Sequence, residues 1–469
     1  MGFMRCHLKT WEFTLSEDLF DIVVLGGGNG GYACALRAAN LGMAVALVEA
    51  DKLGGTCLHR GCIPTKALLR AAEVADTVRE STAWGVTATF SGVDMLKVKE
   101  FQSEVIDKMY RGLQGLVKAR HVELVSGRGY LTSPDTITVG DRVLRGKHIV
   151  LASGSFTKNL GMHLGTRIIG SEHALFLDYV PSSVVILGGG VIGVEFASLW
   201  KSFGADVTII EALPHLVPNE DTDVSKGLEK AFKSRGIKIL TNTRFAAATE
   251  DASGVNVSTE DGQQLRADYL LVAIGRAPNT ADMGYESQGI SLNRGFVTTN
   301  ERLHTGVGNI YAVGDIVSGP QLAHRAMMQG IFVAEEIAGL HPQVVPADNI
   351  PRVTFCEPEI ASVGLTEEKA KEIYGAENIE TAKSNMLGNA KSQMLRATGF
   401  VKLVQVKGGS IVGFHALGQR MGEQIGEGQL MVNWEAEATD LAFLTHAHPT
   451  QNEMIGEAAM ALAGKPLHG

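Results

Sequence analysis

The sequence is poor in cysteine, and this shortage narrows the class of protein. Its 469 residues contain five cysteines, and only Cys57 and Cys62 lie close together in the chain. An odd number with one close pair argues against the disulfide framework of a secreted protein. We therefore expect a reducing, cytoplasmic location in which one cysteine pair carries redox chemistry.

Long apolar runs and an excess of positive charge are also missing. The longest apolar candidate, from Val184 to Trp200, is interrupted by glycines, a serine and Glu195, whereas a membrane helix needs roughly 18 uncharged apolar residues. The 42 basic and 51 acidic residues give a net charge of −9, which argues against nucleic acid as a partner because phosphate binding needs a basic face. Residues 1–19 lack a basic start followed by an apolar core, so we expect no signal peptide there. We interpret them as a disordered extension or an upstream translation start.

Glycine, in contrast, is abundant and is placed in a recognisable order. An apolar run from Phe20 to Leu25 predicts a buried parallel strand, and a glycine-rich turn, a helical pattern and a second strand ending at Glu49 follow it. In such a turn Gly26 makes the bend, Gly28 lets the backbone approach a pyrophosphate, and Gly31 allows close helix–strand packing. A turn without a ligand is the alternative, but it leaves the position of the acid unexplained.

The same unit recurs with each landmark displaced by 162 residues. A strand from Val184 to Leu187 leads into Gly188, Gly190 and Gly193, and the next strand ends at Glu211. The chain should therefore hold two dinucleotides. An acid at this strand end favours the free ribose hydroxyls of NAD, and no arginine follows it to receive the 2′-phosphate of NADP.

The cysteine pair stands in a bent segment about 30 residues after the first glycine turn. Cys57 and Cys62 are five residues apart, further than a straight helix permits for a disulfide, which needs Cα atoms roughly 4.4–6.8 Å apart. Gly61 makes the required bend inexpensive. Two ordinary buried thiols are the alternative, and a surface lysine is the alternative for Lys66.

Two further motifs hold polar groups that invite more than one reading. Asp315 follows an apolar strand, where it caps a helix or binds a ligand. His446 and His448 read as loop residues or metal ligands, although no third and fourth ligand lies at a suitable spacing, so we expect no metal site. Beyond Arg352 the alternating apolar runs predict an antiparallel sheet with helices and no further nucleotide fold.

The segment Gly-Gly-x-Cys-x4-Cys-x-Pro-x-Lys, which ends at Lys66, and His448-Pro449-Thr450-x-x-Glu453 carry a resemblance. Through these motifs the chain resembles the class I flavin-dependent pyridine nucleotide-disulfide oxidoreductases. The resemblance extends from about Phe20 to the last residues of the chain. The resemblance implies an α/β fold with two Rossmann-like domains and an α+β C-terminal dimerisation domain. The expected segments are an extension (1–19), an FAD domain (20–152), an NAD domain (153–279), a central segment completing the FAD site (280–350) and an interface domain (351–469).

The resemblance assigns cofactors to the two glycine turns, FAD to the first and NAD to the second. The residues implied for FAD are Gly26, Gly28, Gly31, Glu49, Thr56, Lys66, Gly129, Ser153, Gly154, Asp315 and Ala323. The residues implied for NAD are Gly188, Gly190, Gly193, Glu195, Glu211, Phe245 and Gly275.

The resemblance also assigns roles in catalysis. Cys57 is the interchange thiol that forms a mixed disulfide, and Cys62 faces the flavin. His448 is the acid–base catalyst that Glu453 orients, and this pair serves the cysteines of the other subunit of a homodimer. Lys66 pairs with Glu195 near the reactive nitrogen of the flavin. His446 is not expected to be the base.

The implied reaction is the oxidation of protein-bound dihydrolipoamide with NAD+, on lipoyl domains of 2-oxo-acid dehydrogenase or glycine-cleavage complexes. An NAD(P)H-dependent reductase of a small disulfide, of the glutathione or mycothiol type, is the alternative, and Glu211 argues against its NADPH form. A non-catalytic flavoprotein scaffold is a third reading. The intact Cys57, Cys62, His448 and Glu453 speak against that reading.

Overall fold

The computed structural model describes residues 17–468 as two compact units. Unit 1 comprises 17–55, 110–155 and 278–342, and unit 2 comprises 56–109, 156–277 and 343–468. The chain passes between the units near β7 (Ser155–Thr157) and β16 (Arg276–Pro278). Residues 1–16 of the expected extension lie outside the described residues, and residues 17–19 belong to the first strand.

Unit 1 is built on a mainly parallel sheet with the strand order β3-β2-β1-β6-β5-β4, and β19 pairs with the other edge of β6. The apolar ends of its central parallel strands, Ile22–Leu25 of β1 and Ile149–Leu151 of β6, are buried, as the apolar run before Gly26 predicts. The elements are β1 (Glu17–Leu25), α1 (Asn29–Asn40), β2 (Val45–Glu49), β3 (Glu123–Ser126), β4 (Gly129–Ser133), β5 (Thr136–Val139), β6 (Arg142–Leu151), β17 (Leu292–Asn293), β18 (Phe296–Val297), β19 (Ile310–Ala312) and α8 (Ala323–Ile337).

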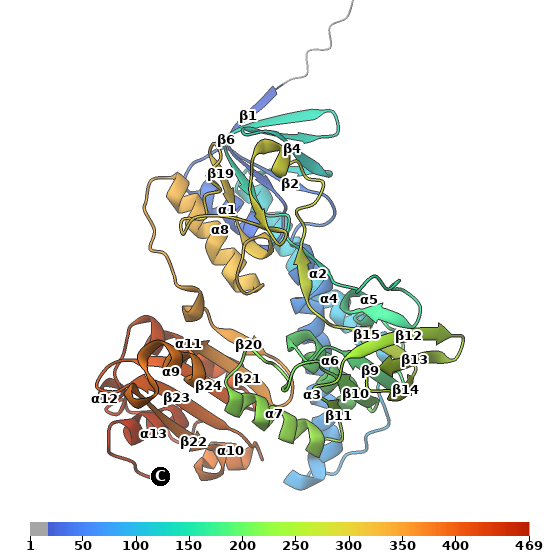
Figure 1. Ribbon diagram of the computed structural model, residues 1–469, viewed down its shortest axis with the longest axis vertical. Coiled ribbons are helices and arrows are strands. Elements are labelled where there is room, and N and C mark those ends of the chain that lie inside the picture. Colours follow the sequence, from blue (N-terminus) through green and yellow to red (C-terminus); the bar gives the residue numbers. More distant parts are fainter. Residues whose placement is uncertain (1–16, 469) are drawn as a thin grey trace, which may run out of the picture. The chain divides into compact units, whose positions relative to one another are not determined.

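Two helices of unit 1, α1 and α8, lie side by side (Figure 1). Their backbones meet at a pair of glycines, since a Cβ atom on Gly330 would stand 2.1 Å from the carbonyl oxygen of Gly30. No side chain larger than hydrogen fits that crossing. Through this contact the C-terminal helix of the unit supports the helix that follows the first glycine turn.

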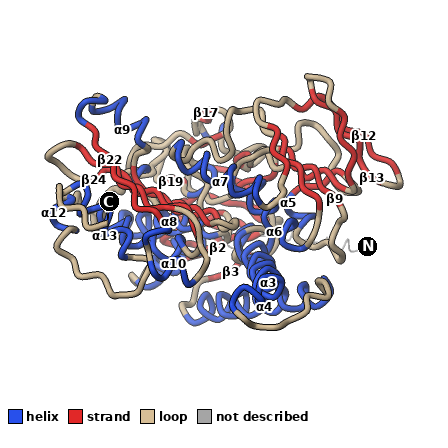
Figure 2. The backbone as a smooth tube through the Cα atoms, turned by 90° about the horizontal axis from the view of Figure 1, so that it is seen from below, coloured by secondary structure: helices blue, strands red, loops and turns tan. Residues whose placement is uncertain are grey.

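Unit 2 contains the second nucleotide fold, a parallel sheet with the order β11-β10-β9-β15-β8. An antiparallel meander, β12-β13-β14, packs beside it (Figure 2). The elements are β8 (Ile168–Gly170), α5 (Ser171–Ala174), β9 (Ser183–Leu187), α6 (Val191–Phe203), β10 (Asp206–Ile210), α7 (Thr222–Ser234), β11 (Lys238–Leu240), β12 (Phe245–Asp251), β13 (Gly254–Thr259), β14 (Gln264–Ala267) and β15 (Tyr269–Val272). The duplication seen in the sequence is thus a duplication of structure.

The cysteine segment forms two helices, α2 (Gly55–Arg60) and α3 (Cys62–Glu80), and α4 (Met95–Ala119) begins after an irregular stretch. Helix α3 packs against α6. Buried Leu68 and Ala72 of α3 share one core with Val194, Phe196 and other apolar residues of α6. The apolar face of α3 is therefore part of the core of unit 2.

The last part of unit 2 is an antiparallel sheet of order β20-β21-β24-β23-β22. One face shares a core with α11, α12 and α13, which lie beside the sheet in Figure 1. The elements are β20 (Arg352–Thr354), β21 (Glu359–Gly364), α9 (Glu367–Tyr374), β22 (Ile379–Asn385), α10 (Ala390–Met394), β23 (Phe400–Val406), β24 (Ile411–Gly418), α11 (Met421–Asn433), α12 (Ala438–Leu441) and α13 (Glu453–Leu462). The expected change of architecture after Arg352 is confirmed.

A buried charge cluster connects this sheet to the second nucleotide fold. Lys402 of β23 is 3% exposed, and its ammonium group lies 2.9 Å from Asp221, 2.9 Å from Asp223 and 2.6 Å from Glu367. Asp221 also caps α7 by accepting the backbone N–H of Asp223. The hydrogen bonds to these carboxylates raise the pKa of Lys402, although burial works against its charge.

We predict that Lys402→Met destabilises the protein by about 3–5 kcal/mol, because it leaves the buried carboxylate of Asp221 without its cation. Lys383→Met is the matched control, since Lys383 binds the same Asp223 at 2.8 Å from a site that is 36% exposed. Its cost should stay within about 1 kcal/mol. Urea and thermal unfolding measure both, and equal losses would contradict the buried cluster.

Candidate functional site

Three glycines of the first glycine turn have different roles. Gly26 has a φ of +110°, and a Cβ atom there would stand 2.2 Å from the carbonyl oxygen of Ala152. A Cβ on Gly31 would come within 1.8 Å of the Gly26 oxygen, whereas a Cβ on Gly28 would meet nothing within 4 Å. The outer glycines therefore serve the fold, and the middle glycine leaves open space where a pyrophosphate would approach.

The second turn repeats this arrangement in unit 2. Gly188 also has a φ of +110°, with its Cβ direction blocked at 2.5 Å by the Ala273 oxygen. Gly193 is blocked at 1.9 Å by the Gly188 oxygen, and Gly190 faces open space. Each open glycine precedes a helix, α1 or α6, whose N-terminal N–H groups attract phosphate. Both turns thus fit a dinucleotide.

The two acids at the strand ends brace their turns in the same way. Glu49 accepts the backbone N–H of Gly27 at 2.7 Å, and Glu211 accepts that of Gly189 at 2.7 Å. The second oxygen of Glu211 accepts the N–H of Leu213 at 2.7 Å. Each carboxylate is therefore held at the turn by the protein itself, at the position expected for a ribose ligand.

The cysteine pair lies where α2 ends and α3 begins. Gly61 separates the helices, and a Cβ atom there would stand 3.1 Å from the Thr56 oxygen, so the break leaves little room for a side chain. The two thiols are hydrogen-bonded to each other. The bend that the spacing requires is thus present, and both cysteines are half-buried.

The surroundings of Cys62 favour its thiolate form. The hydrogen bond from Cys57, helped by the charge of Lys66, lowers the pKa of Cys62 to about 7, although burial opposes the shift. Donating that bond, together with burial, raises the pKa of Cys57. Cys62 is also the first residue of α3, where the helix dipole favours an anion.

Lys66 and Glu195 form the ion pair that the resemblance implies. The Lys66 ammonium group donates to both oxygens of Glu195 at 2.9 Å. Glu195 lies in the first turns of α6, and its side chain is 5% exposed. One of its oxygens also accepts the backbone N–H of Phe355 at 2.9 Å. The structure thus joins the thiol helix to the helix of the second glycine turn.

The histidine motif forms its own pair in the C-terminal part of unit 2. His448 Nδ1 lies 2.8 Å from Glu453, and the other oxygen of Glu453 accepts the Thr450 N–H at 2.8 Å. These two bonds lower the pKa of Glu453. The His448 side chain is 72% exposed and its bond to Pro449 is cis. His446 instead binds Glu427 at 2.8 Å.

Asp315 and Ser153 have protein partners in unit 1 that the sequence did not reveal. Ser155 donates its hydroxyl to Asp315 at 2.6 Å. The Ser153 hydroxyl donates to the Asn279 oxygen at 2.6 Å and lies 2.9 Å from the hydroxyl of buried Tyr285. Partners this distant in the chain carry no local sequence signal.

The remaining candidates occupy varied positions. Gly129 is buried in β4, where a Cβ would stand 2.6 Å from Leu25, so sheet packing alone requires glycine there. Gly154 and Gly275 have positive φ and open Cβ directions. Ala323 begins α8 and Phe245 begins β12, where it packs on an apolar core. Their cofactor contacts stay predictions, as does that of half-buried Thr56.

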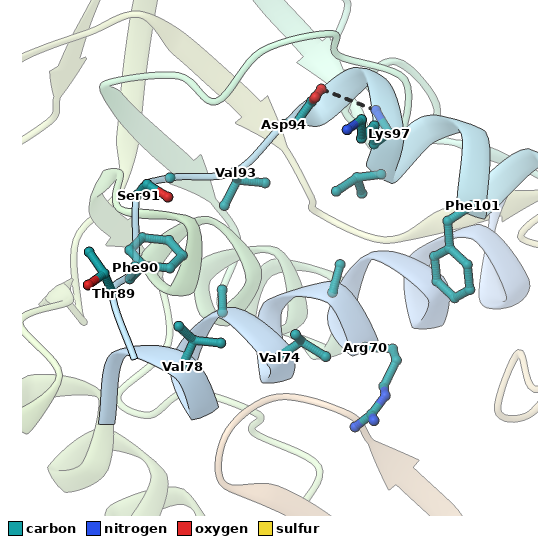
Figure 3. Close-up of a pocket in the computed structure, with 14 residues that line it drawn as sticks. Arg70, Val74, Val78, Thr89, Phe90, Ser91, Val93, Asp94, Lys97 and Phe101 are labelled. Carbon is teal, nitrogen blue, oxygen red and sulfur yellow. Dashed lines mark hydrogen bonds between the residues drawn. The ribbon is translucent and has the colours of Figure 1, made fainter. Parts of the chain in front are cut away.

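A separate cavity of about 550 Å³ lies between the C-terminal half of α3 and the start of α4 (Figure 3). It is mainly apolar, with Val74, Val78 and Phe90 around it and Asp94 and Lys97 at one side. None of the candidate residues named above lines it.

Two features are absent from residues 17–468. No helix in this part of the chain is long and apolar enough to cross a membrane. Within the same residues, no three histidine, cysteine, aspartate or glutamate side chains are grouped as a metal site would require.

Two dinucleotide folds and a thiol pair with one stabilised thiolate define an oxidoreductase that exchanges electrons between thiols and nucleotide cofactors. Comparison with known families identifies which one. Residues 20–330 match the model for pyridine nucleotide-disulphide oxidoreductases, and residues 350–459 match the dimerisation domain of the same enzymes. The chain belongs to the pyridine nucleotide-disulphide oxidoreductase family, and it uses FAD and NAD(H).

Curated relatives resemble the chain over nearly its whole length. Dihydrolipoyl dehydrogenase of Bacillus subtilis is 37% identical, over 96% of this chain and 99% of the relative. The enzyme of that name from Zymomonas mobilis is 38% identical with the same coverage. The mitochondrial one of Pisum sativum is 35% identical, over 98% of this chain and 95% of the relative.

Solved structures agree in fold. LpdA from Mycobacterium tuberculosis superimposes with a TM-score of 0.88 at 26% identity, over 95% of this chain and 99% of the other. RclA from Escherichia coli, described as a flavoprotein disulfide reductase induced by HOCl, gives a TM-score of 0.83 at 27% identity, over 94% of this chain and 99% of its own. The expected α/β architecture with two nucleotide folds is confirmed.

We predict that the middle and the last glycine of the second turn separate binding from folding. Gly190→Ala should change stability by less than about 1 kcal/mol but weaken NAD binding about tenfold or more, because its Cβ enters the open space. Gly193→Ala should cost about 3 kcal/mol through its backbone clash. Thermal unfolding and NADH fluorescence titration measure the two effects, and unchanged NADH affinity in Gly190→Ala would contradict the site.

Proposed function

We propose that the chain oxidises protein-bound dihydrolipoamide to lipoamide with NAD+, as the dihydrolipoyl dehydrogenase component of 2-oxo-acid dehydrogenase complexes. The Cys57–Cys62 pair at the start of α3, on the helix that carries the Lys66–Glu195 ion pair, carries the proposal. The substrate is supported by the relatives, whose names at 35–38% identity are dihydrolipoyl dehydrogenase. Glu211, held at the second turn, supports NAD over NADP.

The proposed chemistry is two successive thiol–disulfide exchanges. A substrate thiol, deprotonated at His448 Nε2, attacks the Cys57 sulfur of the oxidised pair. The Cys57–Cys62 bond breaks, a mixed disulfide forms on Cys57, and Cys62 leaves as a thiolate. The second substrate thiol then attacks the substrate sulfur of the mixed disulfide. The bond to Cys57 breaks, and the substrate leaves as lipoamide. Two electrons have passed to the cysteines, and two protons have left the substrate.

The neighbours of each group support these roles. Cys62 is a good leaving group because its pKa is lowered to about 7. Glu453 holds His448 through Nδ1, which leaves Nε2 free to take and return the proton. Bound FAD supplies the acceptor for the two electrons of the dithiol and NAD+ receives them as hydride.

The residues assigned to the two cofactors are those that the family resemblance implies. Gly28 and the α1 N-terminus would hold the pyrophosphate of FAD, with Glu49 at its ribose and Asp315 at its ribityl chain. Gly190, the α6 N-terminus and Glu211 would do the same for NAD. The open space at each middle glycine supports this fit.

The remaining parts of the proposal concern assembly. The dimerisation domain at 350–459 supports a homodimer, in which His448 and Glu453 of one subunit serve Cys57 and Cys62 of the other. We assign lipoyl domains of 2-oxo-acid dehydrogenase or glycine-cleavage complexes as partners. A cytoplasmic location fits a thiol pair that must be reduced and reoxidised in each turnover.

The direct test is a side-by-side assay of the FAD-loaded enzyme. We expect NAD+ reduction with dihydrolipoamide and little NADPH-linked reduction of glutathione disulfide. Cys57→Ser should abolish lipoamide turnover, and His448→Gln should lower it by about 10²–10⁴-fold through loss of the proton acceptor. Strong NADPH–glutathione activity without lipoamide turnover would overturn the assignment.

Mixed dimers test the shared site. Each subunit of a Cys57→Ser and His448→Ala hybrid supplies what the other lacks, so one of its two sites is intact. Random reassembly of the two inactive variants should restore about a quarter of wild-type lipoamide turnover. The reassembled homodimer of either variant alone is the control. Hybrids that form, as shown by mass spectrometry, but stay inactive would rule out a site built from two subunits.

A further inference from the structure

Phe355 contacts both members of the Lys66–Glu195 pair. It lies between β20 and β21, and its backbone N–H donates to Glu195 at 2.9 Å. Its ring face lies under the Lys66 ammonium group, 4.8 Å from Nζ to the ring centroid. The ammonium group is therefore placed between a carboxylate and an aromatic face, a geometry in which the ring attracts the cation.

The position of Phe355 is set by contacts outside the ion pair. The N–H of Glu357, two residues further on, donates to the Ser198 hydroxyl at 2.8 Å, and Arg235 donates to the Glu357 carbonyl at 2.9 Å. Ser198 lies on α6 one turn after Glu195. The segment that carries Phe355 is thus bonded to α6 on its own account. The flexible side chain of Lys66 packs against the Phe355 ring, whose backbone is held by these bonds.

The place of the Lys66 charge matters because it bears on the thiols. Lys66 is four residues after Cys62 on α3, the spacing of neighbours on one helix face. Its charge lowers the pKa of Cys57 and of Cys62, whereas the charge of Glu195 raises that of Cys62. A shift of the ammonium group away from the cysteines would leave the carboxylate effect less compensated.

We propose that Phe355 is a positioning residue whose ring holds the Lys66 ammonium group at the cysteine pair and so stabilises the Cys62 thiolate. The proposal rests on the proposed function in that the Cys57–Cys62 pair is taken as the redox centre. Phe355 acts through Lys66 and is assigned no contact with substrate.

The test is the pH dependence of thiol alkylation in the FAD-loaded, dithiothreitol-reduced enzyme. Brief iodoacetamide pulses at graded pH, followed by peptide mass spectrometry, give a separate profile for each cysteine. Phe355→Leu removes the ring face and keeps apolar volume, so it should raise the Cys62 midpoint by about half a pH unit. Phe355→Tyr keeps the ring and should leave the midpoint unchanged. If Phe355→Leu does not fold, Phe355→Met supplies the same comparison.

A double-mutant cycle separates positioning from packing. In a Lys66→Gln background, where the cation is gone, Phe355→Leu should no longer move the Cys62 midpoint. An equal shift in that background, or no shift in a stably folded Phe355→Leu enzyme, would overturn the proposal. The assay contains neither lipoamide nor NAD. A midpoint shift without lipoamide turnover would therefore refute the proposed function alone, and turnover without the shift would refute only the role of Phe355.

Discussion

The ion pair between Lys66 and Glu195 is the constraint on which the arrangement of unit 2 depends. A carboxylate that is 5% exposed is stable in its charged form only when its lone pairs are satisfied. Glu195 meets that condition with the ammonium group of Lys66 and the backbone N–H of Phe355. One buried charge thus ties together the thiol helix, the helix of the second glycine turn and the start of the C-terminal sheet.

This arrangement places opposing charges around the thiols. The ammonium group of Lys66 supports a thiolate at Cys62, and the carboxylate of Glu195 opposes it. A pKa near neutrality for Cys62 suits a thiol that must act as a leaving group in one step and an electron donor in the next. The protein obtains this balance from fixed partners rather than from exposure to water.

Features set by residue type at a fixed spacing were predictable from the sequence. The glycine turns are examples, since Gly31 and Gly193 are required by backbone contacts within their own strand–turn–helix unit. The bend at Gly61 is likewise local, whereas the pairing of His448 with Glu453 came from the resemblance. The resemblance supplied the pairing of Lys66 with Glu195.

Contacts between segments far apart in the chain were not predictable. Phe355 meets Glu195 across 160 residues, and Ser155 meets Asp315 across the same separation. The hydrogen bond of Phe355 uses a backbone N–H, which every residue except proline has, so no sequence motif marks it. The contact between Ser155 and Asp315 is not marked by a motif either. Likewise, an amphipathic helix such as α3 shows which face is apolar but not which helix will cover it.

The acid at the second turn has a consequence for how coenzyme preference can change. One oxygen of Glu211 accepts the N–H of Gly189, and the other accepts that of Leu213. An arginine in place of Glu211, introduced to receive a 2′-phosphate, would leave both amides without their acceptor. A change of coenzyme from NAD to NADP that replaces Glu211 therefore also removes two of the backbone contacts that hold this turn.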